Sequence, residues 1–180
     1  DALPETPIEG VLLANEVLDA LPVARACKTA AGWDELRVAG DAQSGFRDHP
    51  SPASPALGTA LAALETALGA PLPVGYITEW QAWLPAWMAS LDACFFCFCM
   101  LWIDYGLPRH LYYHPERITG TLRCHYRHRA HNDPYRWPGL QDLTASVDFT
   151  ALAEAGVNAG FDLAGYCSQA SFLLGNGLEL

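Results

Sequence analysis

Apolar residues in this chain follow two patterns: short continuous runs and runs with helical spacing. Continuous apolar runs bounded by turn residues are typical of strands, and apolar residues at i, i+3 and i+4 predict amphipathic helices. The strand pattern covers Val11–Ala14, Trp33–Val38, Val74–Ile77, Phe95–Ile103, Ala145–Phe149 and Phe161–Tyr166. The helical pattern covers Ala56–Leu68, Trp80–Leu91, Thr150–Gly160 with Thr150 as its cap, and Gln169–Leu174. This mixture indicates an α/β protein.

Two of the predicted strands run directly into polar residues. Asn15, Glu16 and Asp19 follow the first strand, and Asp104 and Tyr105 follow the longest one. In open α/β sheets ligands bind beyond the carboxyl ends of the strands, so these side chains are candidates for a functional site. The alternative is that Asn15 or Asp19 only accepts backbone N–H groups at the start of a helix.

Two stretches lack a clear period. Gly40–Pro55 is rich in Asp, Ser, Gly and Pro, which predicts a loop. Leu107–Leu140 combines Pro, His, Arg, Tyr and Gly, and a long connection of this kind in a compact domain is usually functional.

Composition and charge limit the classes of partner. The 180 residues suit one domain, and the formal net charge of −10 argues against nucleic acid as a general partner. The bases are nevertheless concentrated, because one stretch with five histidines also contains most of the arginines. These arginines are Arg109, Arg117, Arg123, Arg127, Arg129 and Arg136. Such a segment could meet an acidic partner or an anionic cofactor.

The longest apolar run, Ala93–Ile103, is far shorter than the roughly 20 residues of a membrane-spanning helix, so we expect no membrane insertion. Three of the six cysteines, Cys94, Cys97 and Cys99, lie in this run. In a strand the last two share one side and Cys94 faces the other, so we expect buried reduced thiols rather than a metal or redox pair. Reduced thiols predict a cytoplasmic protein.

A second candidate for metal binding is the histidine series His125, His128 and His131, with Asp133 nearby. Interleaved arginines would repel a cation, and the neighbouring prolines oppose a continuous helix, so we expect no metal site. The sequence also contains no nucleophile-elbow or phosphate-loop pattern.

The order of the short motifs resembles the MidA-like family of S-adenosylmethionine-dependent methyltransferases, which includes a mitochondrial arginine methyltransferase needed for complex I assembly. The resemblance runs over nearly the whole chain. It is carried by Leu13-Ala14-Asn15-Glu16, Asp19-Ala20-Leu21-Pro22-Val23, Ile103-Asp104-Tyr105-Gly106, Gly120-Thr121-Leu122, His128, Pro138-Gly139, Asp142-Leu143-Thr144, Val147-Asp148-Phe149, Gln169 and Phe172-Leu173.

The resemblance implies a Rossmann-like class I methyltransferase fold and S-adenosyl-L-methionine as cofactor. It also implies a protein substrate in which an arginine side chain accepts the methyl group. It makes Glu16 and Asp104 the candidate catalytic residues and Asn15 and Glu16 the candidate cofactor-binding residues. Candidate substrate- or partner-binding residues are Asp19, Tyr105, His128, Asp142 and Gln169. Asp104 and Asp142 could instead tie the long connection to the sheet through hydrogen bonds.

In the family, a glycine-rich loop and a ribose-binding acid precede the Asn15-Glu16 motif, and only fourteen residues precede it here. We therefore expect residues 1–180 to be the C-terminal part of a methyltransferase domain that lacks its N-terminal cofactor-binding strands. We also expect a loop and helix insertion around 40–72 and a functional connection around 107–144. Such a chain would be inactive alone and would expose a sheet edge that pairs with another chain or aggregates. The resemblance also implies that the protein is mitochondrial if it comes from a eukaryote. The competing hypothesis is a partner-binding assembly module without methyltransferase activity.

Overall fold

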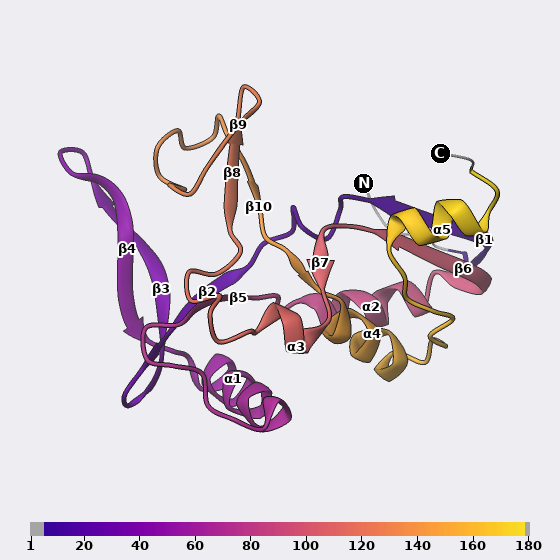
Figure 1. Ribbon diagram of the computed structural model, residues 1–180, viewed down its shortest axis with the longest axis horizontal. Helices are drawn as coiled ribbons and strands as arrows, with labels where there is room; N and C mark the ends of the chain where they lie inside the picture. The colour runs from indigo at the N-terminus through magenta and orange to yellow at the C-terminus, as the bar shows by residue number, and fades with distance from the viewer. Residues whose placement is uncertain (1–5, 179–180) are drawn as a thin grey trace.

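The computed structural model describes residues 6–178 (Figure 1). One part of the fold is built on a parallel pair of strands, β1 (Ile8–Asn15) and β6 (Phe95–Ile103), in register from Glu9 opposite Cys97 to Asn15 opposite Ile103. Both strands come from the apolar runs of the sequence, and the prediction of Phe95–Ile103 as a strand is confirmed.

Two helices cover one face of this pair. They are α2 (Leu84–Asp92) and α4 (Phe149–Asn158), whose apolar sides form a buried cluster around Leu18. Leu12 of β1 and Met100 and Trp102 of β6 pack against the cluster. This alternation along each strand is the period of two expected for a sheet with one covered face.

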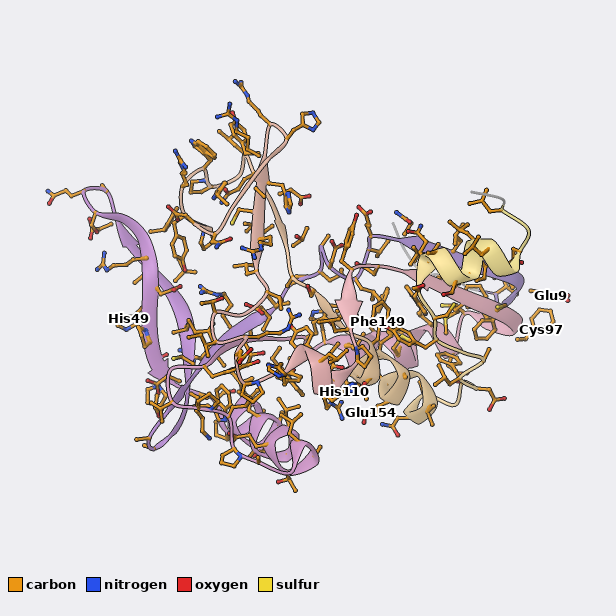
Figure 2. The ribbon with its side chains drawn as sticks, viewed as in Figure 1. Glu9, His49, Cys97, His110, Phe149 and Glu154 are labelled. Carbon is orange, nitrogen blue, oxygen red and sulfur yellow. The ribbon has the colours of Figure 1, made fainter. Side chains whose placement is uncertain are left out.

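The opposite face of the pair is open in the part of the chain that the structure describes. Val11 is 73% exposed and Leu13 is 64% exposed, and Cys97 and Cys99 are exposed as well. Figure 2 shows Cys97 and Glu9 at the outer end of the two strands. The prediction of a buried thiol is therefore confirmed for Cys94 but wrong for Cys97 and Cys99. Nothing between residues 6 and 178 covers the side of β6 on which these two residues lie.

A second core lies between an antiparallel sheet and a helix. The sheet has the order β4-β3-β2-β5, and α1 packs on it through Leu57, Leu61 and Leu64. The elements are β2 (Ala24–Thr29), β3 (Gly32–Asp41), β4 (Gly45–Pro52), β5 (Ile77–Trp80) and α1 (Pro55–Leu68). Trp33 and Tyr76 are buried in this core with Tyr112 and Tyr113.

The prediction of a loop over Gly40–Pro55 is wrong, because β4 pairs with β3 along its whole length. The side chains of β4 are almost all exposed, so no apolar alternation marks the strand in the sequence. Pro50 and Pro52 are tolerated there because β4 is an edge strand. The region 40–72, expected to be a loop and helix insertion, contains the end of β3, the strand β4 and the helix α1.

Smaller elements complete the chain. They are β7 (Gly106–Leu107) paired with β11 (Val147–Asp148), α3 (Arg109–Tyr112), the sheet β10 (Asp142–Thr144), β8 (Arg123–Tyr126) and β9 (Arg129–His131), and α5 (Gln169–Gly175). The sheet of β8, β9 and β10 and the β3–β4 hairpin extend away from the helices in Figure 1. No helix among residues 6–178 has both the length and the apolar character needed to cross a bilayer.

Three further expectations need correction. Phe161–Tyr166 is not a strand, since no neighbour among the described residues pairs with it. The helix expected from Trp80 begins at Leu84, because Trp80 still belongs to β5. Asp148, not Thr150, caps α4, because its carboxylate accepts the N–H groups of Thr150 and Ala151.

The buried carboxylate of Glu79 joins β5 to the loop that precedes β8 through hydrogen bonds. Glu79 is 4% exposed and accepts hydrogen bonds from the Thr121 N–H at 2.8 Å and the Thr121 hydroxyl at 2.9 Å. Gly120 adopts a φ of 73°, and a Cβ there would lie 2.4 Å from Glu79 Oε1. Glycine is therefore required at this contact, both for its backbone angle and for its lack of a side chain.

We expect Gly120→Ala to destabilise the protein by about 2–3 kcal/mol, because it combines backbone strain with a clash against Glu79. Gly139→Ala is the matched control, since Gly139 has a φ of 77° but nothing within 4 Å of its Cβ position. The control should cost about 1 kcal/mol of backbone strain. Urea denaturation of both variants measures the difference, and equal losses would show that the contact with Glu79 contributes nothing.

Candidate functional site

The candidate site lies where the two parallel strands end. Asn15 is paired with Ile103, and the Glu16 N–H donates to the Ile103 carbonyl at 2.8 Å. Since parallel strands present their carboxyl ends at the same edge, the residues that follow them are brought together. Glu16 adopts a left-handed φ of 52°, and both Asn15 and Glu16 are exposed.

Asp104 holds the segment that follows β1. Its Oδ2 accepts the Leu18 N–H at 2.8 Å and the Asp19 N–H at 3.3 Å, and its Oδ1 accepts the Tyr105 N–H at 2.8 Å. A carboxylate used in this way fixes the backbone of both strand ends. The geometry favours a positioning function for Asp104, and its catalytic role stays a prediction.

Asp19 is the buried acid of the site. It is 6% exposed, and its Oδ1 has no hydrogen-bond partner among the described residues. Burial raises the pKa of Asp19, and the negative charges of Asp104 and Glu16 raise it further. The backbone beside it is well anchored, because the Asp19 carbonyl accepts the Ala145 N–H at 2.8 Å. The site therefore contains a fixed, partly unsatisfied carboxyl group.

Tyr105 lies beside Glu16 at the surface. The hydrogen bond with the Glu16 carboxylate is the largest cause of the raised pKa of Tyr105, followed by the Glu16 charge. Tyr105 is 65% exposed, so its ring is accessible to a ligand. Five of the predicted site residues are thus together, namely Asn15, Glu16, Asp19, Asp104 and Tyr105.

The other predicted site residues are placed differently. Asp142 begins β10 opposite His125, and its charge contributes to the raised pKa of Asp19, so it borders the site. His128 lies in the turn between β8 and β9, and Gln169 is the first residue of α5. Among the described contacts, none joins His128 or Gln169 to Glu16.

The three histidines of the 125–131 series belong to one hairpin. His125 and His131 are on strands, and His131 packs edge-on against Trp137 at 5.3 Å between ring centroids. No group of three or more His, Cys, Asp or Glu side chains within residues 6–178 could hold a metal ion.

Sequence reasoning missed several polar residues around the site. The Gln81 amide donates to the Leu18 carbonyl at 3.0 Å, which holds the segment between Glu16 and Asp19 from the other side. Gln81 also lines a cavity of about 160 Å³, together with Glu79, Arg109 and Asp148. Arg109 hydrogen-bonds both oxygens of Glu154, which is labelled at the lower edge of Figure 2. The signal available in the sequence was the position of Glu79 directly after a predicted strand, whereas Gln81 fell inside a predicted helix.

Comparisons with known proteins identify a matching family and similar solved structures. The pattern of the family described as "Putative S-adenosyl-L-methionine-dependent methyltransferase" matches residues 1–167. A crystal structure of a protein from Burkholderia thailandensis, described as a "likely methyl transferase" and bound to S-adenosyl-homocysteine, is 46% identical, with a TM-score of 0.85 over 98% of this chain. A native structure of an uncharacterised protein from the same organism is also 46% identical, with a TM-score of 0.86 over 98% of this chain.

The chain spans 44% of the first of these proteins and 46% of the second. The comparison with curated proteins finds no match.

We expect Asp104→Ala to lower the free energy of unfolding by about 2–4 kcal/mol, because it leaves backbone N–H groups of Leu18, Asp19 and Tyr105 without their acceptor. Asp162→Ala is the matched control, since Asp162 is exposed and has no hydrogen bond among the described residues. It should change stability by less than about 0.5 kcal/mol. Chemical denaturation followed by tryptophan fluorescence measures both, and a neutral Asp104→Ala would contradict the positioning function.

We expect Asp19→Asn to stabilise the protein at neutral pH. A carboxyl group whose pKa is raised by folding contributes stability that is fully present below its ordinary pKa and lost as the pH rises through the raised value. The variant does not titrate, so its advantage should be small at pH 3.5 and grow towards pH 7, to the order of 1 kcal/mol for a buried group freed of its charge. Urea midpoints at several pH values measure this, and parallel curves for the two proteins would rule it out.

Proposed function

The chain belongs to this family of S-adenosyl-L-methionine-dependent methyltransferases, and we propose that it forms part of an enzyme that methylates an arginine side chain of a protein. The observation that carries the proposal is the acidic end of the β1–β6 pair, where exposed Glu16 lies beside buried Asp19, one oxygen of which has no hydrogen-bond partner among residues 6–178. The neighbour with bound S-adenosyl-homocysteine supports the choice of cofactor.

Asn15 and Glu16 fit one end of such a cofactor. Both are exposed, both follow the parallel strand β1, and they offer an amide and a carboxylate that can accept hydrogen bonds from an ammonium group. When bound, S-adenosyl-L-methionine supplies a methyl group on a positively charged sulfur. The left-handed backbone of Glu16 fixes the direction in which the chain leaves the strand, so these two side chains are held by the sheet itself.

An arginine side chain as the methyl acceptor suits the carboxylates of the site. Arginine presents planar N–H donors that match carboxylate oxygens, and Glu16, which we also propose for the cofactor, and Asp19 Oδ1, which has no hydrogen-bond partner within residues 6–178, can accept from it. Two carboxylates would hold the guanidinium in one orientation, and orientation is the main requirement of an in-line transfer. Glu16 is the candidate to stabilise the positive charge of the acceptor during the reaction. Tyr105 lies beside Glu16, whose carboxylate raises the pKa of the Tyr105 hydroxyl.

Further parallel strands, supplied from outside these 180 residues, would complete the sheet. A two-stranded parallel sheet with exposed Val11 and Leu13 is not a stable arrangement by itself, since parallel sheets are normally covered on both faces. We therefore propose that the cofactor also contacts loops beyond the described strands and that this chain alone is inactive. The free cysteines are the basis for proposing a cytoplasmic protein.

A partner-binding function without catalysis is the second candidate. It is favoured by the arginines of the hairpin formed by β8 and β9, whose tip extends away from the helices in Figure 1, and no described hydrogen bond joins these arginines to Glu16 or Asp19. The two candidates differ in whether the cofactor binds.

The test is calorimetric titration of S-adenosyl-homocysteine into the longer protein that contains this chain and into the 180-residue chain alone. We expect the longer protein to bind, the chain alone to bind at least about tenfold more weakly, and Asn15→Ala in the longer protein to weaken binding about tenfold, the effect of one lost hydrogen bond. Asn176→Ala is the control, because Asn176 lies beyond α5. Absence of binding by the longer protein would favour the partner-binding function.

A further inference from the structure

We propose that residues 123–137, here named the basic arm, bind acidic residues that flank the methyl-accepting arginine of a protein substrate. The arm consists of the β8–β9 hairpin and the loop that folds back on it. This inference rests on the proposed function, because it assigns a property of the substrate rather than a second activity.

The basic arm has a net positive charge although the chain as a whole is acidic. Its four exposed arginines are Arg123, Arg127, Arg129 and Arg136. None of the four forms an ion pair with a carboxylate in the part of the chain that the structure describes. The one aspartate of the arm, Asp133, accepts the Tyr135 N–H at 3.0 Å instead. Clustered arginines without counter-ions repel one another, and an anionic partner relieves this repulsion.

Three of these arginines lie around two stacked rings near the tip of the arm. Tyr126 and Trp137 have ring centroids 4.5 Å apart, and Arg129 is opposite Tyr126 in the hairpin register. The Arg127 guanidinium lies 5.3 Å from the Tyr126 ring, and that of Arg136 lies 4.5 Å from the Trp137 ring. Figure 2 shows nitrogen-bearing side chains projecting from this end of the hairpin. Cation–π contacts restrain long side chains, so fewer rotamers are lost when an anion binds.

The other end of the arm begins beside the proposed methyl-transfer site. β10 pairs with β8 so that Thr144 is opposite Arg123, and the next residue, Ala145, donates its N–H to the Asp19 carbonyl at 2.8 Å. Strand residues are about 3.3 Å apart, so the arginines near the tip lie about 10–13 Å further along the arm than Arg123. An extended peptide covers that length in about three to four residues. A protein substrate with its arginine in the acidic site can therefore place nearby residues against the arm.

Carboxylates of a protein suit this surface better than a nucleic acid does. Tyr126 and Trp137 are half-buried and stack on each other and on arginines, so base stacking on these rings is disfavoured. The net charge of −10 also repels a long polyanion, whereas screening over about 10 Å spares a short acidic stretch from most of that repulsion. Carboxylates match arginine in bidentate geometry.

The test is fluorescence anisotropy of four labelled peptides with the longer protein that contains this chain. Each peptide has a central arginine or glutamine, two glycines on either side of it, and three glutamates or three serines at each end. We expect the arginine peptide with glutamates to bind at least about tenfold more tightly than the one with serines at low salt. This advantage should fall to about threefold or less at 200 mM salt, because screening weakens surface attraction.

Arg127→Asn combined with Arg129→Gln should remove most of the glutamate advantage, at least about fivefold, and leave binding of the serine peptides unchanged. Asparagine tolerates the positive φ of 48° at position 127, so the hairpin should keep its fold. Arg37→Gln combined with Arg117→Gln is the matched control, since both residues are exposed, lie outside the arm and give the same change in net charge. It should change each affinity less than about twofold.

The flanking residues test the arm, and the central residue tests the proposed acceptor. The inference is overturned if glutamates give no advantage, if the control pair reduces that advantage as much as the arm variants, or if unlabelled oligothymidine displaces the peptide more effectively than unlabelled glutamate peptide. Equal binding of the arginine and glutamine peptides would count against an arginine acceptor, while a persisting glutamate advantage would still support the arm as a surface for acidic segments.

Discussion

The parallel pairing of β1 with β6 is the constraint on which the rest of this structure depends. Parallel strands cannot be joined by a tight turn, so the chain must leave the carboxyl end of β1 and return to the amino end of β6. It does so through the whole antiparallel sheet, α1 and α2. The pairing also decides the chemistry, because it sets Asn15 and Glu16 beside the residues that follow Ile103. The site is thus a result of strand direction rather than of sequence proximity.

Buried and half-buried carboxylates among the described residues mostly serve the backbone. Asp104 accepts N–H groups of the segment after β1, Glu79 accepts those of Thr121 and Leu122, and Asp148 caps α4. In each case a charge that would be costly to bury is satisfied by donors that would otherwise be unpaired. Asp19 is different, because one of its oxygens lacks such a donor within the described residues. That difference separates an acid that holds the structure together from one that is available to a ligand.

Much of the fold could be predicted where burial leaves a pattern in the sequence. β6 and α1 lie in apolar runs with clear periods, and both were predicted nearly to the residue. β4 could not be predicted, since an exposed edge strand has no apolar alternation. The joining of Glu16, Asp19 and Asp104 followed from the rule that ligands bind beyond strand ends, and the structure brings them together. The hydrogen bond from Gln81 to the Leu18 carbonyl could not be predicted, because a contact between residues far apart in the chain leaves no local pattern in the sequence.

The turn between β8 and β9 has one more consequence. Arg127 and His128 both adopt positive φ angles, 48° and 60°, in a two-residue hairpin turn for which Asn-Gly is the favoured pair. Arginine and histidine disfavour positive φ angles, so the backbone strain at these two positions is roughly 1 kcal/mol or more for each residue. Conflicts of this kind concentrate at positions where the side chain serves something other than folding. An Asn-Gly turn would make a more stable hairpin but would lack the guanidinium and imidazole groups. The strained backbone at these two positions therefore marks the end of the hairpin as a surface whose side chains serve something other than folding.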